Sequence, residues 1–157
     1  MSSHFIKKRE PPPGLSSFTR IRLGWISPDQ VVLVKPGEAR HTFLSPLAED
    51  GETLAIKIPL KSGHYYLVEN RQPIGFDRVL PDSGILILKV NPNAVEGSGT
   101  VKVMDADPDS PNFSHATYRS DRKDRNIFID KENHLAILPL RSKGDAEGVL
   151  VTTPDKL

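Results

Sequence analysis

Beyond Trp25, the apolar residues of this chain alternate with polar ones and are interrupted at short intervals by turn-forming residues. A period of two is that of a β-strand with one buried face, whereas a helix would bring apolar residues back every three or four positions. The chain also carries 14 prolines and 11 glycines among 157 residues, and these residue types end strands and helices. We therefore predict an all-β fold of many short strands joined by turns.

About eight to ten such strands are expected, a number typical of an antiparallel β-sandwich or a partly closed barrel. The first two predicted strands are joined through Pro36-Gly37, which favours a hairpin. The aliphatic segment 85–90 is expected to be a central strand. The predicted strands cover residues 30–34, 39–43, 54–60, 65–70, 85–90, 100–104, 126–129, 134–138 and 148–152.

One short N-terminal segment has a helical period instead. Leu15, Phe18, Ile21 and Trp25 recur at spacings of three, three and four, with a serine available as N-cap and Gly24 as the residue that ends the helix. Two interpretations of this apolar stripe are open. It is a face that packs against another protein domain, or it is an internal contact between the helix and a sheet.

These patterns divide the chain into three parts. Residues 1–14 form an extended Pro-rich lead-in, residues 15–25 the short helix, and residues 26–157 a single β-domain. Neither a signal peptide nor a run of about 20 apolar residues is visible, so we expect no membrane insertion and leave the localisation open.

Charge and cysteine content restrict the function classes. A formal net charge of +1 predicts neither a nucleic-acid partner nor an anionic membrane, and the basic run 119–125 has no interleaved aromatic residue for stacking on bases. The absence of cysteine excludes disulfides, thiol nucleophiles and iron–sulfur ligation.

The sequence predicts no zinc site and no catalytic residues. The five histidines never occur as an i, i+4 pair, and there is no His-Glu-x-x-His motif. Asp105, Asp107 and Asp109 are weak candidates for calcium ligands, because alternate carboxylates in a loop can supply oxygen ligands. An EF-hand is excluded by Ser110 and Ala116 at its sixth and twelfth positions. The alternative is an Asp-rich turn that caps its own backbone.

A second charged group is predicted to be structural. Glu69 and Arg71 lie two apart on a predicted strand, and Asp77 and Arg78 follow after a Pro-Ile-Gly turn. Such a network can position a substrate carboxylate, but in a β-rich domain we expect it to tie a loop to the sheet.

Part of the sequence is similar to a known protein family. The string Tyr-Tyr-Leu-Val-Glu-Asn-Arg-Gln at 65–72, then Gly-Phe-Asp at 75–77 and Leu-Pro-Asp-Ser-Gly-Ile-Leu-Ile at 80–87, resembles a signature of the immune inhibitor A family of zinc metallopeptidases. Upstream, Leu-Gly-Trp-Ile at 23–26 resembles the motif that ends a short helix in that family. The segments 103–108, 128–130 and 1–4 are similar to further parts of it, the last to the Met-turn.

The resemblance implies a non-catalytic β-domain, C-terminal to the zinc motif, that packs beside a metallopeptidase catalytic domain. Zinc would then belong only to the complete parent enzyme, and this chain alone would not hydrolyse peptides. Members of the family are largely secreted. The resemblance of this sequence to the family does not specify a substrate. The main alternative is a free-standing β-sandwich binding module, in which calcium could bind within the loop 105–125. The third alternative is a metallopeptidase whose zinc ligands come from another polypeptide.

Overall fold

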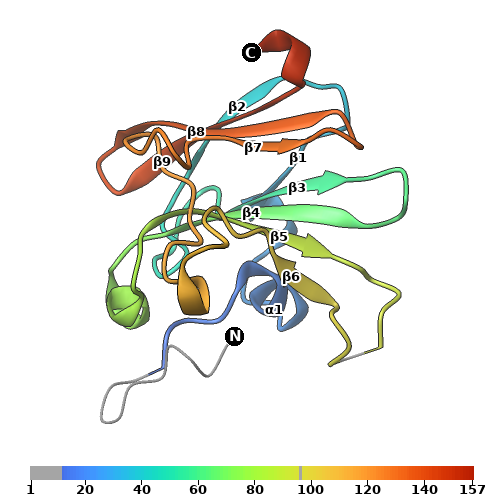
Figure 1. The fold of residues 1–157 in the computed structure, drawn as a ribbon. Helices are drawn as coiled ribbons and strands as arrows, with labels where there is room; N and C mark the ends of the chain where they lie inside the picture. Colours follow the sequence, from blue (N-terminus) through green and yellow to red (C-terminus); the bar gives the residue numbers. More distant parts are fainter. Residues whose placement is uncertain (1–11, 96) are drawn as a thin grey trace.

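The computed structural model describes residues 12–95 and 97–157, which form nine strands in two sheets and one short α-helix (Figure 1). The five-stranded sheet has the order β1-β3-β4-β5-β6, and the four-stranded sheet the order β2-β9-β8-β7. Most of the predicted lead-in, with the segment 1–4, lies outside the described residues. The strands are β1 (Val31–Leu33), β2 (Arg40–Leu44), β3 (Ala55–Pro59), β4 (Tyr65–Arg71), β5 (Gly84–Val90), β6 (Val101–Val103), β7 (Phe128–Asp130), β8 (Leu135–Lys143) and β9 (Ala146–Thr152).

The main core lies between the two sheets. Alternate residues of β3 point into it, so that Ile56 and Ile58 are fully buried, as the period of two predicted. Tyr66 of the five-stranded sheet meets Phe128 of the four-stranded sheet edge to face, with ring centroids 5.3 Å apart. The prediction of a mostly β sandwich is confirmed, and the described strands do not close into a barrel.

The predicted hairpin of the first two strands is wrong. β1 pairs in parallel with β3, which makes the five-stranded sheet mixed, whereas β2 pairs antiparallel with β9 in the other sheet. The chain crosses between the sheets at Val34, whose side chain is fully buried in the main core. A turn sequence restricts the local backbone but does not choose the pairing partner, which depends on where the apolar faces are buried.

The N-terminal helix is shorter than predicted. α1 spans Ser17–Arg22, with Ser16 as its N-cap, and it ends at Gly24, which has a positive φ of 73°. Phe18 and Ile21 pack on the outer face of the five-stranded sheet, in a second apolar cluster around Leu67 and Leu88. The helix therefore covers the sheet face opposite the main core.

The remaining predicted strands are confirmed with small changes of boundary. β5 lies inside its sheet between β4 and β6, and β8 continues beyond its predicted end to Lys143. Four single turns of 3-10 helix complete the secondary structure: η2 (Pro28–Gln30), η3 (Gly75–Val79), η4 (Pro111–Phe113) and η5 (Pro154–Lys156). No helix in the described ranges has the length and apolar character needed to cross a membrane.

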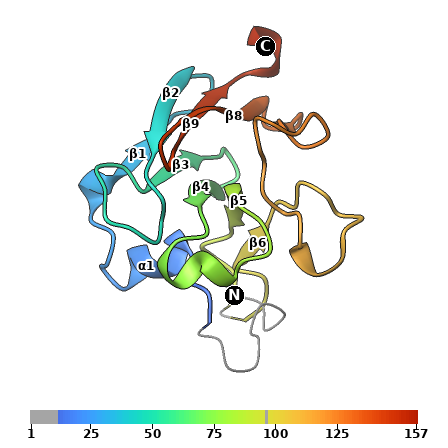
Figure 2. The ribbon, with the colours of Figure 1, turned by 90° about the vertical axis from the view of Figure 1, so that its left-hand side faces the viewer.

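The connections between strands gather at two opposite ends of the sandwich (Figures 1 and 2). One end carries the loops 34–39 and 60–64, the β5–β6 loop, the turn 131–134 and the C-terminal segment 153–157. The opposite end carries the loops 45–54, 72–83 and 104–127 and the β8–β9 turn. We call the first the lysine end and the second the arginine end, after the basic residue that predominates at each.

Candidate functional site

The predicted charge network exists and is buried. Arg71 is 2% exposed and lies between two fully buried carboxylates. Its guanidinium is 3.1 Å from Glu69 Oε1 and 2.9 Å from Asp77 Oδ1. Burying two carboxylates and one guanidinium costs stability, which further hydrogen bonds offset; among the described residues only Asp77 Oδ2 of the carboxylate oxygens has no such partner.

Those further hydrogen bonds come from the N-terminal segment. Arg71 donates to the carbonyl oxygen of Gly14 at 2.8 Å, Asp77 accepts from the amide of Gly14 at 2.9 Å, and Glu69 accepts from the amide of Ser17 at 2.8 Å. The network therefore fastens the segment before α1 to the end of β4. This arrangement is the structural role predicted for it, because the partners are the chain's own backbone groups.

Arg78 does not belong to this network. Its side chain is exposed and donates to the carbonyl oxygen of Gly75 at 2.9 Å. Arg78 follows Asp77 directly within the single turn η3, and the two side chains point in different directions. The prediction that Arg78 belongs to the network, which rested on its proximity to Asp77 in the sequence, is therefore wrong.

The predicted apolar stripe is divided by the fold. Phe18 and Ile21 make the internal contact with the sheet, and Leu15 is half-buried, with its carbonyl oxygen accepting from Arg20 and Arg71. Trp25 lies beyond the end of α1 and is 64% exposed. The internal interpretation therefore holds for the helix, while Trp25 faces outward.

Trp25 borders an open depression of about 740 Å³ at the arginine end. One wall is the segment from Trp25 to Gln30, and the other is the loop between β2 and β3. Gln30 holds the walls together, because its side-chain amide donates to Asp50 Oδ1 and to the carbonyl oxygen of Gly51, both at 2.9 Å.

The lining of the depression is acidic. Its one cationic side chain, Arg20, donates to the backbone carbonyls of Leu15 and Leu47. A hydrogen bond from Ser27 holds the pKa of Asp29 below its usual range, so that this carboxylate is ionised at neutral pH. An exposed indole beside several carboxylates can bind a cation through its ring face and through charge. The carboxylates of the lining are Asp29, Glu49, Asp50 and Glu52.

The calcium candidates are engaged in local hydrogen bonds. Asp105 Oδ1 accepts from the amide of Asp107 at 3.0 Å, and Asp107 Oδ2 accepts from the hydroxyl of Ser110 at 2.6 Å and lies 3.4 Å from His115 Nδ1. This geometry is that of a turn capped by its own side chains. Within the described residues, no three His, Asp or Glu side chains gather where they could hold a metal ion. Calcium binding, which also includes Asp109, stays a prediction.

A second ion-pair group, which sequence reasoning missed, anchors the long loop 104–127. The carboxylate of Asp82 contacts Arg125 and accepts from the hydroxyl of Thr117 at 2.6 Å, and it lies 3.5 Å from Arg119. Burial by itself raises the pKa of Asp82. The hydrogen bonds from Thr117 and Arg125 and the charge of Arg125 together outweigh this effect, so that the pKa lies below its usual range. No spacing signal links Asp82 to residues more than 30 positions away.

Beside this group lies a small polar pocket of about 190 Å³, formed where the two sheets meet. Glu147 of β9 reaches it together with Arg119, Asp121 and three serines. Burial raises the pKa of Glu147, and the nearby charge of Arg119 only partly opposes this rise.

We compared the chain with models of known protein families, with curated protein sequences and with solved structures, and none of the three comparisons found a match.

Proposed function

We propose that this chain is a non-catalytic β-sandwich domain that packs against another protein domain through the surface around Trp25. The observation that carries this proposal is the 64% exposure of the only tryptophan in the chain. Tryptophan and tyrosine residues that remain exposed in a folded domain are characteristic anchors of protein interfaces.

The surroundings of Trp25 support an interface rather than an isolated exposed side chain. Leu23, two residues before it at the C-terminal end of α1, is 53% exposed, and Trp25 itself lines the depression. The depression offers a concave surface next to an apolar anchor. That combination of pocket and anchor is the arrangement found at the centre of binding surfaces.

The charge of the depression restricts the partner. Four carboxylates line it, and the guanidinium of Arg20 is already used by backbone carbonyls. A partner surface that brings a lysine or arginine side chain to Trp25 would gain both the ring contact and the carboxylates. The partner surface is therefore expected to be basic.

The sequence resemblance gives this partner an identity, the catalytic domain of an immune inhibitor A-like zinc metallopeptidase. The residues quoted for that resemblance include Leu-Gly-Trp-Ile at 23–26, which contains the anchor itself. The family assignment rests on those sequence strings alone, whereas the interface rests on the geometry of Trp25.

The interface is tested on the chain as it stands, in which the surface around Trp25 is uncovered. We expect the chain to bind a hydrophobic dye and to self-associate at high concentration, and the change Trp25→Ala to reduce both. Phe76→Ala is the matched control, because Phe76 is 63% exposed but lies on η3, outside the depression. A monodisperse monomer without dye binding would overturn the proposed interface.

The identity of the partner is tested at the gene, by reading the DNA upstream of the Met1 codon in the same frame. An in-frame His-Glu-x-x-His motif would support the metallopeptidase partner, and in the longer protein Trp25 should no longer contribute to dye binding. A stop codon without that motif would overturn the peptidase assignment and leave a free-standing binding domain.

A further inference from the structure

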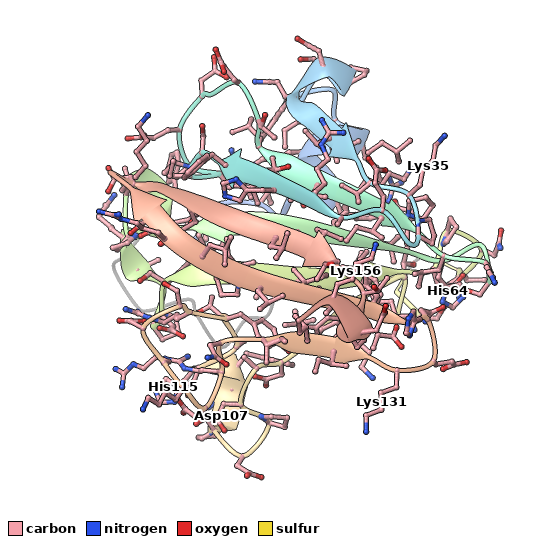
Figure 3. All side chains as sticks on the ribbon, turned by 90° about the horizontal axis from the view of Figure 1, so that it is seen from above. Lys35, His64, Asp107, His115, Lys131 and Lys156 are labelled. Atoms are coloured by element: carbon pink, nitrogen blue, oxygen red, sulfur yellow. The ribbon has the colours of Figure 1, made fainter. Side chains whose placement is uncertain are left out.

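Lysines and arginines occupy opposite ends of the sandwich. Seven of the nine described arginines lie at or near the arginine end; Arg22 lies on α1 over the outer face of the five-stranded sheet, and Arg40 starts β2. Figure 3 shows Lys35, His64, Lys131 and Lys156 on one side of the molecule and Asp107 and His115 on the other. Seven of the nine described lysines lie at or near the lysine end: Lys35, Lys57, Lys61, Lys89, Lys102, Lys131 and Lys156.

The lysines at this end are not used for internal ion pairs. Every ion pair among the described residues involves an arginine or a histidine, and none of the nine described lysines has a described carboxylate oxygen within 4.0 Å. Lys89 and Lys102 even lie directly opposite each other on β5 and β6, an arrangement of like charges that costs stability. Lys57 and Lys89 lie over the rings of Tyr65 and Tyr66, whereas the other five lysines of this end are exposed, make no ion pair or ring contact among the described residues, and are available for a partner.

The acidic residues near this end offset the lysines only in part. Glu38 accepts from the backbone amide of Lys35, Asp130 accepts from Tyr66 and Asn133, and Asp155 contacts His134. Glu132 is exposed, and Glu96 lies outside the described residues. Among the described residues, four acidic side chains thus face eight basic ones when Arg40 is included.

The same end also presents apolar side chains to solvent. Val95, in the β5–β6 loop, is 78% exposed, and the C-terminal Leu157 is 58% exposed. The exposed tryptophan and phenylalanine side chains, on which bases stack best, lie elsewhere, on β2, η3, η4 and the segment after α1. The rings at this end are those of His64, His134 and Tyr65, and the Tyr65 ring is half-buried under Lys57. Neither of the two depressions described above lies here.

Lysines distributed over several loops, with apolar side chains among them, suit a broad anionic surface better than a linear polyanion. We propose that the lysine end docks this domain onto an anionic lipid surface, with lysine ammonium groups at the lipid phosphates and Val95 entering the headgroup region. The docking is peripheral and independent of the proposed Trp25 interface, which lies at the opposite end.

The test measures co-sedimentation of the whole chain with vesicles of phosphatidylcholine alone or mixed with phosphatidylglycerol. We expect binding only to the mixed vesicles and a steep decrease with added salt. Each lysine near an anionic bilayer contributes about five-fold to partitioning, so replacing Lys35, Lys61, Lys131 and Lys156 by serine should reduce binding by about 100-fold or more. Val95→Ser should reduce it by about five-fold.

The matched control replaces Lys123 and Lys143, the two lysines at the arginine end, by serine. It should leave vesicle binding unchanged, and circular dichroism should show that all variants keep the fold, because the four replaced lysines are exposed. Equal losses in both sets of variants, or no binding to mixed vesicles, would overturn the proposal. Tighter binding to double-stranded DNA or heparin than to vesicles would also overturn it, in favour of a linear polyanion.

Discussion

The two ends of this sandwich use charged residues in opposite ways. At the arginine end, guanidinium groups hold buried or half-buried carboxylates and tie loops to the sheets, as Arg71 and Arg125 do. At the lysine end, no described ammonium group has a carboxylate within ion-pair distance; five of the seven lysines are exposed, and Lys57 and Lys89 lie over tyrosine rings. The difference follows from chemistry, because the planar guanidinium matches a carboxylate with two hydrogen bonds, whereas the ammonium is a strongly hydrated point charge.

The largest effect is expected at the buried network. Arg71→Met should lower the free energy of unfolding by about 3–5 kcal/mol, because it leaves two fully buried carboxylates without their cation. Urea denaturation followed by circular dichroism measures this change. A loss below about 1 kcal/mol would mean that the network does not stabilise the arginine end.

A triple variant provides the control for this prediction. When Glu69→Gln and Asp77→Asn accompany Arg71→Met, the buried charges disappear together, and most of the lost stability should return.

A smaller effect is expected at the anchor of the long loop. Arg125→Met should cost about 2 kcal/mol, because the side chains of Arg125 and Asp82 are only 6% and 10% exposed, while Asp82 keeps its hydrogen bond from Thr117. Limited proteolysis should show faster cleavage within 104–127, and thermal unfolding should show a lower midpoint. Arg122→Met, an exposed change in the same loop, is the control.

This anchor also predicts a pH dependence. The pKa of Asp82 is lowered in the folded state, so its contribution is fully present above its unfolded value of about 3.9 and is lost as the pH falls through the folded value. The stability difference between the wild type and Arg125→Met should therefore shrink below about pH 4. A difference that stays constant down to pH 2 would contradict the role assigned to Asp82.

For Glu147, the contribution to stability is expected to change with pH in the opposite direction. Burial raises the pKa of its carboxyl in the folded state, so ionisation at neutral pH destabilises the fold, and stability falls as the pH rises between the unfolded and folded values. Glu147→Gln should raise the free energy of unfolding at pH 7 by less than about 1 kcal/mol and leave it unchanged at pH 3, as measured by denaturation at both pH values. A loss of stability at pH 7 would contradict this prediction.

The smallest effect is expected at the lysine end. Lys102→Gln removes one of two like charges that face each other across β5 and β6, and should stabilise the domain by about 0.2–0.5 kcal/mol at low salt. High salt should abolish the gain, because it screens the repulsion. Lys143→Gln at the arginine end should show no comparable gain in the same denaturation series.

Local sequence patterns predicted the positions of the strands and the helix better than they predicted which strands pair with each other. Apolar alternation, one aliphatic run and the flanking turn residues located the nine strands with shifted boundaries, and the spacing of Phe18 and Ile21 located α1. The parallel pairing of β1 with β3 was not predictable, because it depends on the route of the chain between two sheets. The pairs Glu69–Arg71 and Arg71–Asp77 could be predicted because they are close in sequence, whereas the contact between Asp82 and Arg125 could not.

The sequence by itself determined the fold class, since the period of the apolar residues dictates whether strands or helices can bury a face. It also predicted the pairing of Arg71 with Glu69 and Asp77, which lie on one strand and the turn that follows it, but not the backbone partners Gly14 and Ser17. The tertiary structure alone decided that Trp25 faces solvent beside an acidic loop and that the lysines gather at one end. A net charge of +1 concealed that separation, because the sum of charges carries no information about their positions in space.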